Sequence, residues 1–332
     1  MIKKNTDQRS RNHTFDLLKI ILTFLVVNIH IRVISHGPIN FLESYGYYAV
    51  PLFVTLSFFL MHKYFSQIKL SFSIILQRIK RLILPLIFWS VIGFILKPNL
   101  INIKNVILQL FTGKVVDTPL YYLNILIFLT LFFWLITYVP IKLRPLLHFA
   151  IIIVAFFLEY TGLNTRFFNP MGDEIRKSYG QIVELIKYAS LGMLFASLIN
   201  QNKKKVFIFG PAIITILLLS LFNFPQPWGY NYSGLKLFLG TIYVLSLILL
   251  IGQVNFSHQI NKIIRTFGTY SFGVYLCHII FFEALLGIFP TIIKNFNTSF
   301  PFIFLFIYTT GCYFFCFLFN LLTHKKFSYL FK

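Results

Sequence analysis

The chain has 332 residues, of which 57% are hydrophobic and only 12% are charged. A soluble protein needs roughly 25% charged residues to cover its surface, so this composition excludes a water-soluble globular fold. The net charge is +21, but the Lys and Arg residues stand in short clusters between apolar runs instead of on one polar surface, which argues against a nucleic-acid partner.

Apolar runs follow one another along the whole chain. A bilayer core of about 30 Å needs roughly 20 apolar residues per spanning helix. The candidate runs lie at 17–34, 45–62, 82–96, 119–139, 145–160, 181–200, 206–222, 235–254, 267–289 and 301–322. None alternates polar and apolar residues as the strands of a membrane β-barrel do. We therefore predict an all-α fold, a polytopic membrane bundle of about ten transmembrane helices.

The distribution of basic residues predicts the orientation, because Lys and Arg concentrate on the cytoplasmic side of a membrane. Of the 30 basic residues, 19 lie in the termini and alternate loops, and 8 lie in the remaining loops. This asymmetry predicts that both termini are cytoplasmic. We expect a cytoplasmic segment at 1–16, a membrane domain at 17–322 and a cytoplasmic tail at 323–332. The first run is long and lacks a small-residue cleavage site, so it is predicted to be a permanent span.

Ionisable residues at membrane depth are costly and mark candidate functional sites. His30 lies in the first run and His278 in the ninth, at depths of roughly 20 and 16 Å from the cytoplasmic ends of those runs. Two histidines at similar depth are candidates to line one cavity. The alternative, that each histidine simply bonds to a neighbouring helix, stays open. Nearer the cytoplasm, Asp16 and Lys19 are three residues apart, which predicts an ion pair on one helical face.

Three other residue patterns bear on the structure or the function. Arg78 and Arg81 share a helix face and are either an ordinary cytoplasmic flank or a phosphate grip. Glu184 and Lys187, also three residues apart, predict a local ion pair. The three cysteines lack zinc or redox spacing and are interpreted as packing residues, which predicts no metal site. They are Cys277, Cys312 and Cys316.

Several stretches, in order, resemble the acyltransferase-3 family of integral-membrane O-acyltransferases. The basic-x10-His motif of that family's first helix falls on Lys19 and His30, with Lys where Arg is commoner. The segment Val-Pro-Leu-Phe at 50–53, followed by Ser57, is similar to the family's second span, although Phe58 stands where Gly is usual.

The resemblance continues to the end of the chain. Arg78-x-x-Arg81 looks like the family's Arg-x-x-Arg signature, and Leu-Tyr-Tyr-Leu at 120–123 is similar to its Leu-Trp-Tyr-Leu segment. The run Tyr-Ser-Phe-Gly-Val-Tyr-Leu-Cys-His at 270–278 is similar to a late-span motif that ends in His278. A stand-alone form without an extracytoplasmic domain is expected.

The resemblance implies transfer of an acyl group, usually acetyl, from cytoplasmic acyl-CoA to a hydroxyl of a cell-envelope glycan such as lipopolysaccharide or capsule. It implies a bacterial cytoplasmic (inner) membrane protein with acetyl-CoA as co-substrate and no bound cofactor. His30 would act as general base, and His278 would polarise the carbonyl or position the acceptor. Lys19, Arg78 and Arg81 would bind the phosphates of the donor. The expected orienting residues are Asp16, Ser271 and Tyr275.

A second function stays open at this point. A bundle of ten helices also suits a transporter or flippase that passes a lipid-linked sugar or polysaccharide across the membrane. The Arg-x-x-Arg cluster discriminates between the two, because a flippase has no evident need for a cytoplasmic grip on CoA phosphates.

Overall fold

The computed structural model describes residues 13–35, 46–65, 71–96, 120–163, 173–200, 234–251 and 256–323. Within these ranges the chain forms ten helices and no strand, so the predicted all-α fold is confirmed. The helices are α1 (His13–Ser35), α3 (Ala49–Phe65), α4 (Phe72–Leu96), α6 (Tyr121–Ile136), α7 (Arg144–Thr161), α9 (Asp173–Asn200), α11 (Gly234–Ile251), α12 (His258–Ile288), α13 (Pro290–Ser299) and α14 (Pro301–Leu322).

Each predicted span corresponds to one of these helices, except 206–222, which lies outside the described residues, as do nearly all of the two predicted terminal segments. Four of the described helices, α1, α7, α12 and α14, are long and apolar enough to cross a membrane. Helix α12 begins earlier than predicted because Ser257 caps it, its hydroxyl accepting the N–H of Ile260 at 3.4 Å. The sequence did not predict α13, a short helix whose Ile292 is exposed while Asn297 is buried.

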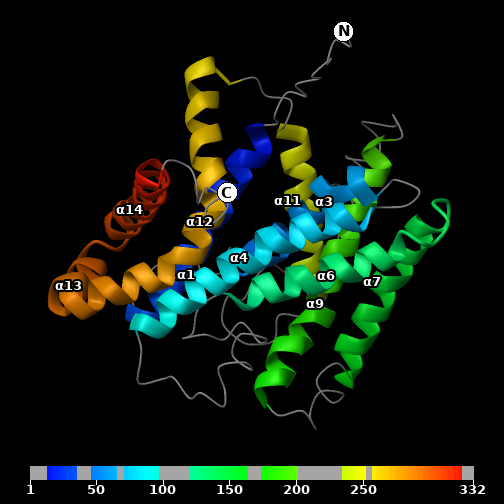
Figure 1. Cartoon of the computed structure of the whole chain (residues 1–332), viewed down its shortest axis with the longest axis horizontal. Coiled ribbons are helices and arrows are strands. Elements are labelled where there is room, and N and C mark those ends of the chain that lie inside the picture. The colour runs from blue at the N-terminus through cyan, green and yellow to red at the C-terminus, as the bar shows by residue number, and fades with distance from the viewer. Residues whose placement is uncertain are drawn as a thin grey trace.

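The helices pack side by side in an extended bundle (Figure 1), with α13 and α14 at one end and α7 at the other. The closest neighbours are α1 with α12, α3 with α9, α7 with α9, and α12 with α14. The outer faces of α7 and α14 carry large apolar side chains that are more than half exposed, among them Phe157 and Phe306. Such surfaces are typical of helices that face lipid.

Helices α1 and α12 meet along one regular seam. Asp16, Thr23 and His30 recur every seven residues on α1, and they meet Gly268, Ser271 and His278 of α12. A seven-residue repeat keeps one face of a helix against its partner.

The closest approach of the seam is at Gly268. A Cβ atom at this position would lie 2.5 Å from the Cβ and 2.9 Å from the Cα of Asp16. Small residues at such crossings let two membrane helices approach closely. Further along the seam, the hydroxyl of Thr23 donates to the carbonyls of Lys19 at 2.7 Å and Ser271 at 3.4 Å. The absence of a side chain at Gly268 therefore sets the spacing of the two helices.

We predict that Gly268→Ala destabilises the protein by about 1–3 kcal/mol, since the added methyl group forces α1 away from α12. The matched control is Gly287→Ala, at a helical glycine of α12 with nothing within 4 Å of the added Cβ. That control should be neutral or stabilising, because Ala favours helix over Gly. Melting temperatures of the purified protein in detergent check both variants, and equal values for the two would contradict this account of the seam.

Candidate functional site

The seam brings together the two histidines that the sequence placed at similar depth. The imidazole rings of His30 and His278 have centroids 5.1 Å apart and planes inclined by 51°. His278 is 1% exposed, and His30 is half-buried. Each stands seven residues beyond a seam contact, His30 beyond Thr23 and His278 beyond Ser271, so the same helix packing that joins those residues also aligns the rings.

The hydrogen bonds of His278 fix the tautomer of its neutral ring. Its Nδ1 lies 2.8 Å from the carbonyl oxygen of Tyr275 and 3.2 Å from that of Val274. A carbonyl oxygen only accepts, so in the neutral imidazole Nδ1 carries the proton and Nε2 keeps a lone pair. Nε2 is buried and has no hydrogen-bond partner among the described residues. His278 is therefore held by its own helix, with a basic nitrogen available inside the bundle.

Aromatic side chains from four helices lie beside His278 or beside its neighbour Tyr275. The ring of Tyr275 lies 6.1 Å from His278, 5.3 Å from Tyr122 of α6 and 5.8 Å from Phe53 of α3. The hydroxyl of Tyr308 on α14 donates to the backbone carbonyl of His278. Tyr275, whose orienting role stays a prediction, is thus a neighbour of His278, whereas nothing in the sequence pattern singled out Tyr308.

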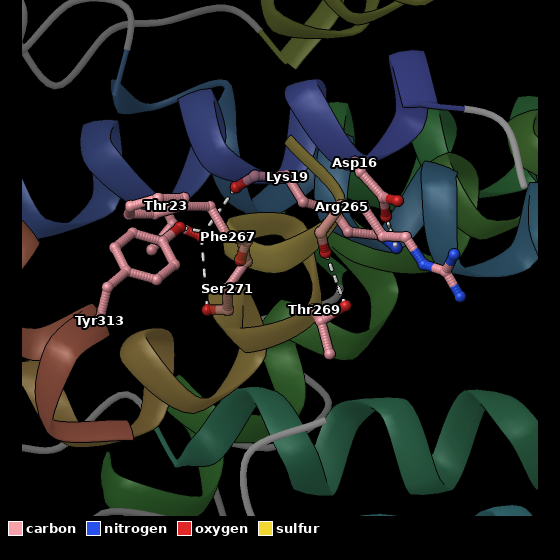
Figure 2. Close-up of polar contacts among 8 residues, drawn as sticks. All are labelled: Asp16, Lys19, Thr23, Arg265, Phe267, Thr269, Ser271 and Tyr313. Atoms are coloured by element: carbon pink, nitrogen blue, oxygen red, sulfur yellow. Dashed lines mark hydrogen bonds and ion pairs between the residues drawn. The ribbon is translucent and has the colours of Figure 1, made fainter. Parts of the chain in front are cut away.

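Polar contacts closer than the histidines to the N-termini of α1 and α12 tie three helices together (Figure 2). The predicted ion pair is confirmed, with Lys19 Nζ 3.2 Å from Asp16 Oδ1. The hydroxyl of Ser271 lies 2.9 Å from that of Tyr313 on α14 and donates to the carbonyl of Phe267 at 3.2 Å. These contacts fix α12 against both α1 and α14.

Arg78 points into the bundle between α3 and α6. Its Nη2 donates to Ser57 at 2.8 Å and its Nε to Thr130 at 3.1 Å. The guanidinium carbon stands 5.6 Å from the ring centroid of Phe58, so the unusual Phe of the second-span motif serves as a platform for the cation. Among the described residues no carboxylate forms an ion pair with Arg78, so within this part of the chain its charge is uncompensated.

The other two predicted phosphate-binding residues have different surroundings. Arg81 is exposed on α4, although it is one turn from the half-buried Arg78. The ammonium group of Lys19 is paired with the carboxylate of Asp16. Of the three, Arg78 therefore combines an inward position with an uncompensated charge.

One ion-pair prediction was wrong. Lys187 donates to Glu159 of α7 and not to Glu184 on its own helix. The reason is tertiary packing, because α7 lies directly against α9 and brings a carboxylate to the fully buried Nζ. The cysteines do pack inside the bundle as predicted, since all three are buried. In the described part of the chain no group of three His, Cys, Asp or Glu residues is placed to hold a metal ion.

Comparison with known families decides the class of this protein. A family model for an acyltransferase domain matches residues 12–322, nearly the whole chain. The chain belongs to the acyltransferase-3 family. This membership confirms the resemblance carried by the ordered motifs, and with the apolar helices it makes the protein an integral-membrane acyltransferase. A search of curated proteins and a search of solved structures each return no match.

In this acyltransferase-3 chain, the proximity of the two histidines can be tested without an activity assay. We predict that His30→Cys with His278→Cys, in a chain whose native cysteines are replaced, is linked efficiently by a short bis-maleimide. The control pair is His278→Cys with Phe157→Cys, which also lie on opposite sides of the cleavage site, since Phe157 is 59% exposed on α7. Gel mobility after cleavage at a protease site inserted within 201–233 detects the link. Equal linking of both pairs would contradict the arrangement.

Proposed function

We propose that this acyltransferase moves an acetyl group from cytoplasmic acetyl-CoA to a hydroxyl of a cell-envelope glycan, in a bacterial inner membrane. The observation that carries the proposal is the contact between His30 and His278, two imidazoles held in the interior of a membrane bundle. An imidazole is the side chain best suited to take and return a proton near neutral pH. Membership of the acyltransferase-3 family supplies the reaction class.

The proposed chemistry is a direct transfer. One imidazole, which we assign to His30, removes the proton of the acceptor hydroxyl while its oxygen attacks the thioester carbon. A carbon–oxygen bond forms, the carbon–sulfur bond breaks, and the imidazolium returns its proton to the departing thiolate. The products are an O-acetyl ester and free CoA, so the step balances without an oxidant or reductant.

The tautomer of His278 distinguishes the two roles that the sequence left open for it. Its Nδ1 proton is directed at backbone carbonyls, so the free Nε2 has no proton to donate to a thioester carbonyl. It is suited instead to accept a hydrogen bond from the acceptor hydroxyl. This supports a positioning role for His278, in which it aligns the hydroxyl beside His30.

Arg78 is the best candidate to meet the donor. A guanidinium binds phosphate through two parallel hydrogen bonds, and Arg78 is uncompensated while its hydroxyl partners Ser57 and Thr130 fix its orientation. We propose that it attracts the CoA phosphates from the cytoplasmic side. Lys19 and Arg81 would add to the positive potential at this entrance.

The proposed function predicts that the general base, His30, is essential for fast transfer. His30→Ala should lower acetyl transfer about 100-fold or more, since general base catalysis contributes at least that much. The control is His258→Ala, an exposed histidine at the start of α12, which should retain full activity. Radiolabelled acetyl incorporated into glycan by matched amounts of inserted protein is the measurement. Wild-type activity of His30→Ala would disprove the assignment.

The proposed function also predicts that Arg78 contributes to binding of acetyl-CoA. Arg78→Lys keeps the charge but loses the planar fork, so the KM for acetyl-CoA should rise about tenfold, the cost of one charge-assisted hydrogen bond. Arg265→Lys, at an exposed position on α12, should leave that KM unchanged. If both variants keep the wild-type KM, Arg78 is a structural residue and not a donor ligand.

A further inference from the structure

A second polar cluster lies inside the bundle between α7 and α9, apart from the histidines. Lys187 is fully buried and donates to Glu159, whose side chain is 26% exposed. The Lys187 Nζ also stands 4.8 Å from the ring centroid of Phe156 and 5.3 Å from that of Tyr188. Buried charges at membrane depth carry a large cost, so a cluster of this kind is a candidate site.

The cluster holds two carboxyl groups and one ammonium group. Glu184, one turn from Lys187 on α9, is half-buried and interacts electrostatically with both Lys187 and Glu159. The ion pair of Lys187 uses Glu159, and the carboxyl group of Glu184 is left with capacity for hydrogen bonds.

An unpartnered hydroxyl points to a ligand. Tyr188 is fully buried, and its hydroxyl has no hydrogen-bond partner among the described residues. The ring of Tyr188 lies 5.3 Å from Lys187 Nζ, so this phenol borders the cluster. A buried hydroxyl without a partner is uncommon in proteins and calls for an explanation such as a ligand.

Helix α6 connects the cluster to the histidines. Tyr121 in its first turn lies within electrostatic range of Glu184. The next residue, Tyr122, contacts Tyr275, whose ring neighbours His278. The cluster and the histidine pair therefore flank the same end of α6.

We propose that the cluster formed by Glu159, Glu184, Lys187 and Tyr188 binds the acceptor glycan, and that this acceptor is a neutral or amino sugar and not an acidic one. The inference rests on the proposed function and adds the class of acceptor. Glu159 and Glu184 accept hydrogen bonds from sugar hydroxyls, Tyr188 donates one, and Lys187 positions Glu159. Because the ammonium of Lys187 is already paired with Glu159, the cluster offers no free cation to an acidic sugar.

The test uses the full chain in lipid nanodiscs. The probe is alkali-deacetylated envelope polysaccharide from the source cells, separated by anion exchange into neutral and acidic fractions. The double variant Glu159→Gln/Lys187→Met replaces the ion pair with neutral side chains of similar size, which is often tolerated or stabilising. Tyr188→Phe removes only the unpartnered hydroxyl and is the second variant. Phe157→Leu, on the exposed face of α7, is the control.

Three readouts are compared: binding of each tritiated fraction, acetyl transfer to it, and hydrolysis of acetyl-CoA without acceptor. We expect the neutral fraction to bind and to be acetylated. In the double variant its KM and Kd should rise about tenfold, the loss of one hydrogen bond to a charged group. Tyr188→Phe should show a smaller rise, and the control Phe157→Leu should leave binding, acetyl transfer and hydrolysis of acetyl-CoA unchanged.

The inference is overturned if the acidic fraction is preferred or if both variants bind and acetylate the neutral fraction like the wild type. Failure of the proposed function looks different. In that case the wild type would transfer no acetyl group, whereas binding of the neutral fraction would still weaken in the two variants.

Discussion

The arrangement of this protein depends on the close approach of α1 and α12 at Gly268. A bundle in lipid gains little from burying apolar side chains, because the surrounding tails are equally apolar, so tight packing and interhelical hydrogen bonds hold the helices together. Here a missing side chain lets Asp16 lie against α12. From that point the seven-residue spacing aligns Thr23 with Ser271 and His30 with His278. A shift of one turn would separate the two rings.

Because polar groups are costly in lipid, the candidate functional groups lie inside the bundle. Arg78 and His278 keep unused binding capacity inside the bundle, one a positive charge and the other a lone pair. Both are fixed by neighbours that do not neutralise them, Ser57 and Thr130 for the first and backbone carbonyls for the second. Preorganised groups of this kind act on a substrate without reorganising when it arrives. The stability of the bundle thus supports groups that an isolated helix would not tolerate.

Sequence reasoning reached much of this architecture because hydropathy and residue spacing are local properties. The spans, the ion pair of Asp16 with Lys19 and the similar depth of His30 and His278 all follow from positions along single helices. The features that sequence reasoning missed depend on contacts between different helices. The partner of Lys187 depends on which helix packs beside α9, and the inward turn of Arg78 depends on hydroxyls of two other helices. The contact between the ring of Phe58 and the guanidinium of Arg78 also joins two different helices.

The central claim, that the bundle transfers an acetyl group instead of moving a glycan, has one direct measurement. Inside-out membrane vesicles containing the protein and deacetylated glycan are given acetyl-CoA labelled in the acetyl group, on the exposed cytoplasmic face. Free CoA thiol and alkali-labile label on the glycan are then followed together. The account predicts that the two appear in equal amounts and at equal rates. Glycan that crosses the membrane without consumption of acetyl-CoA would contradict it.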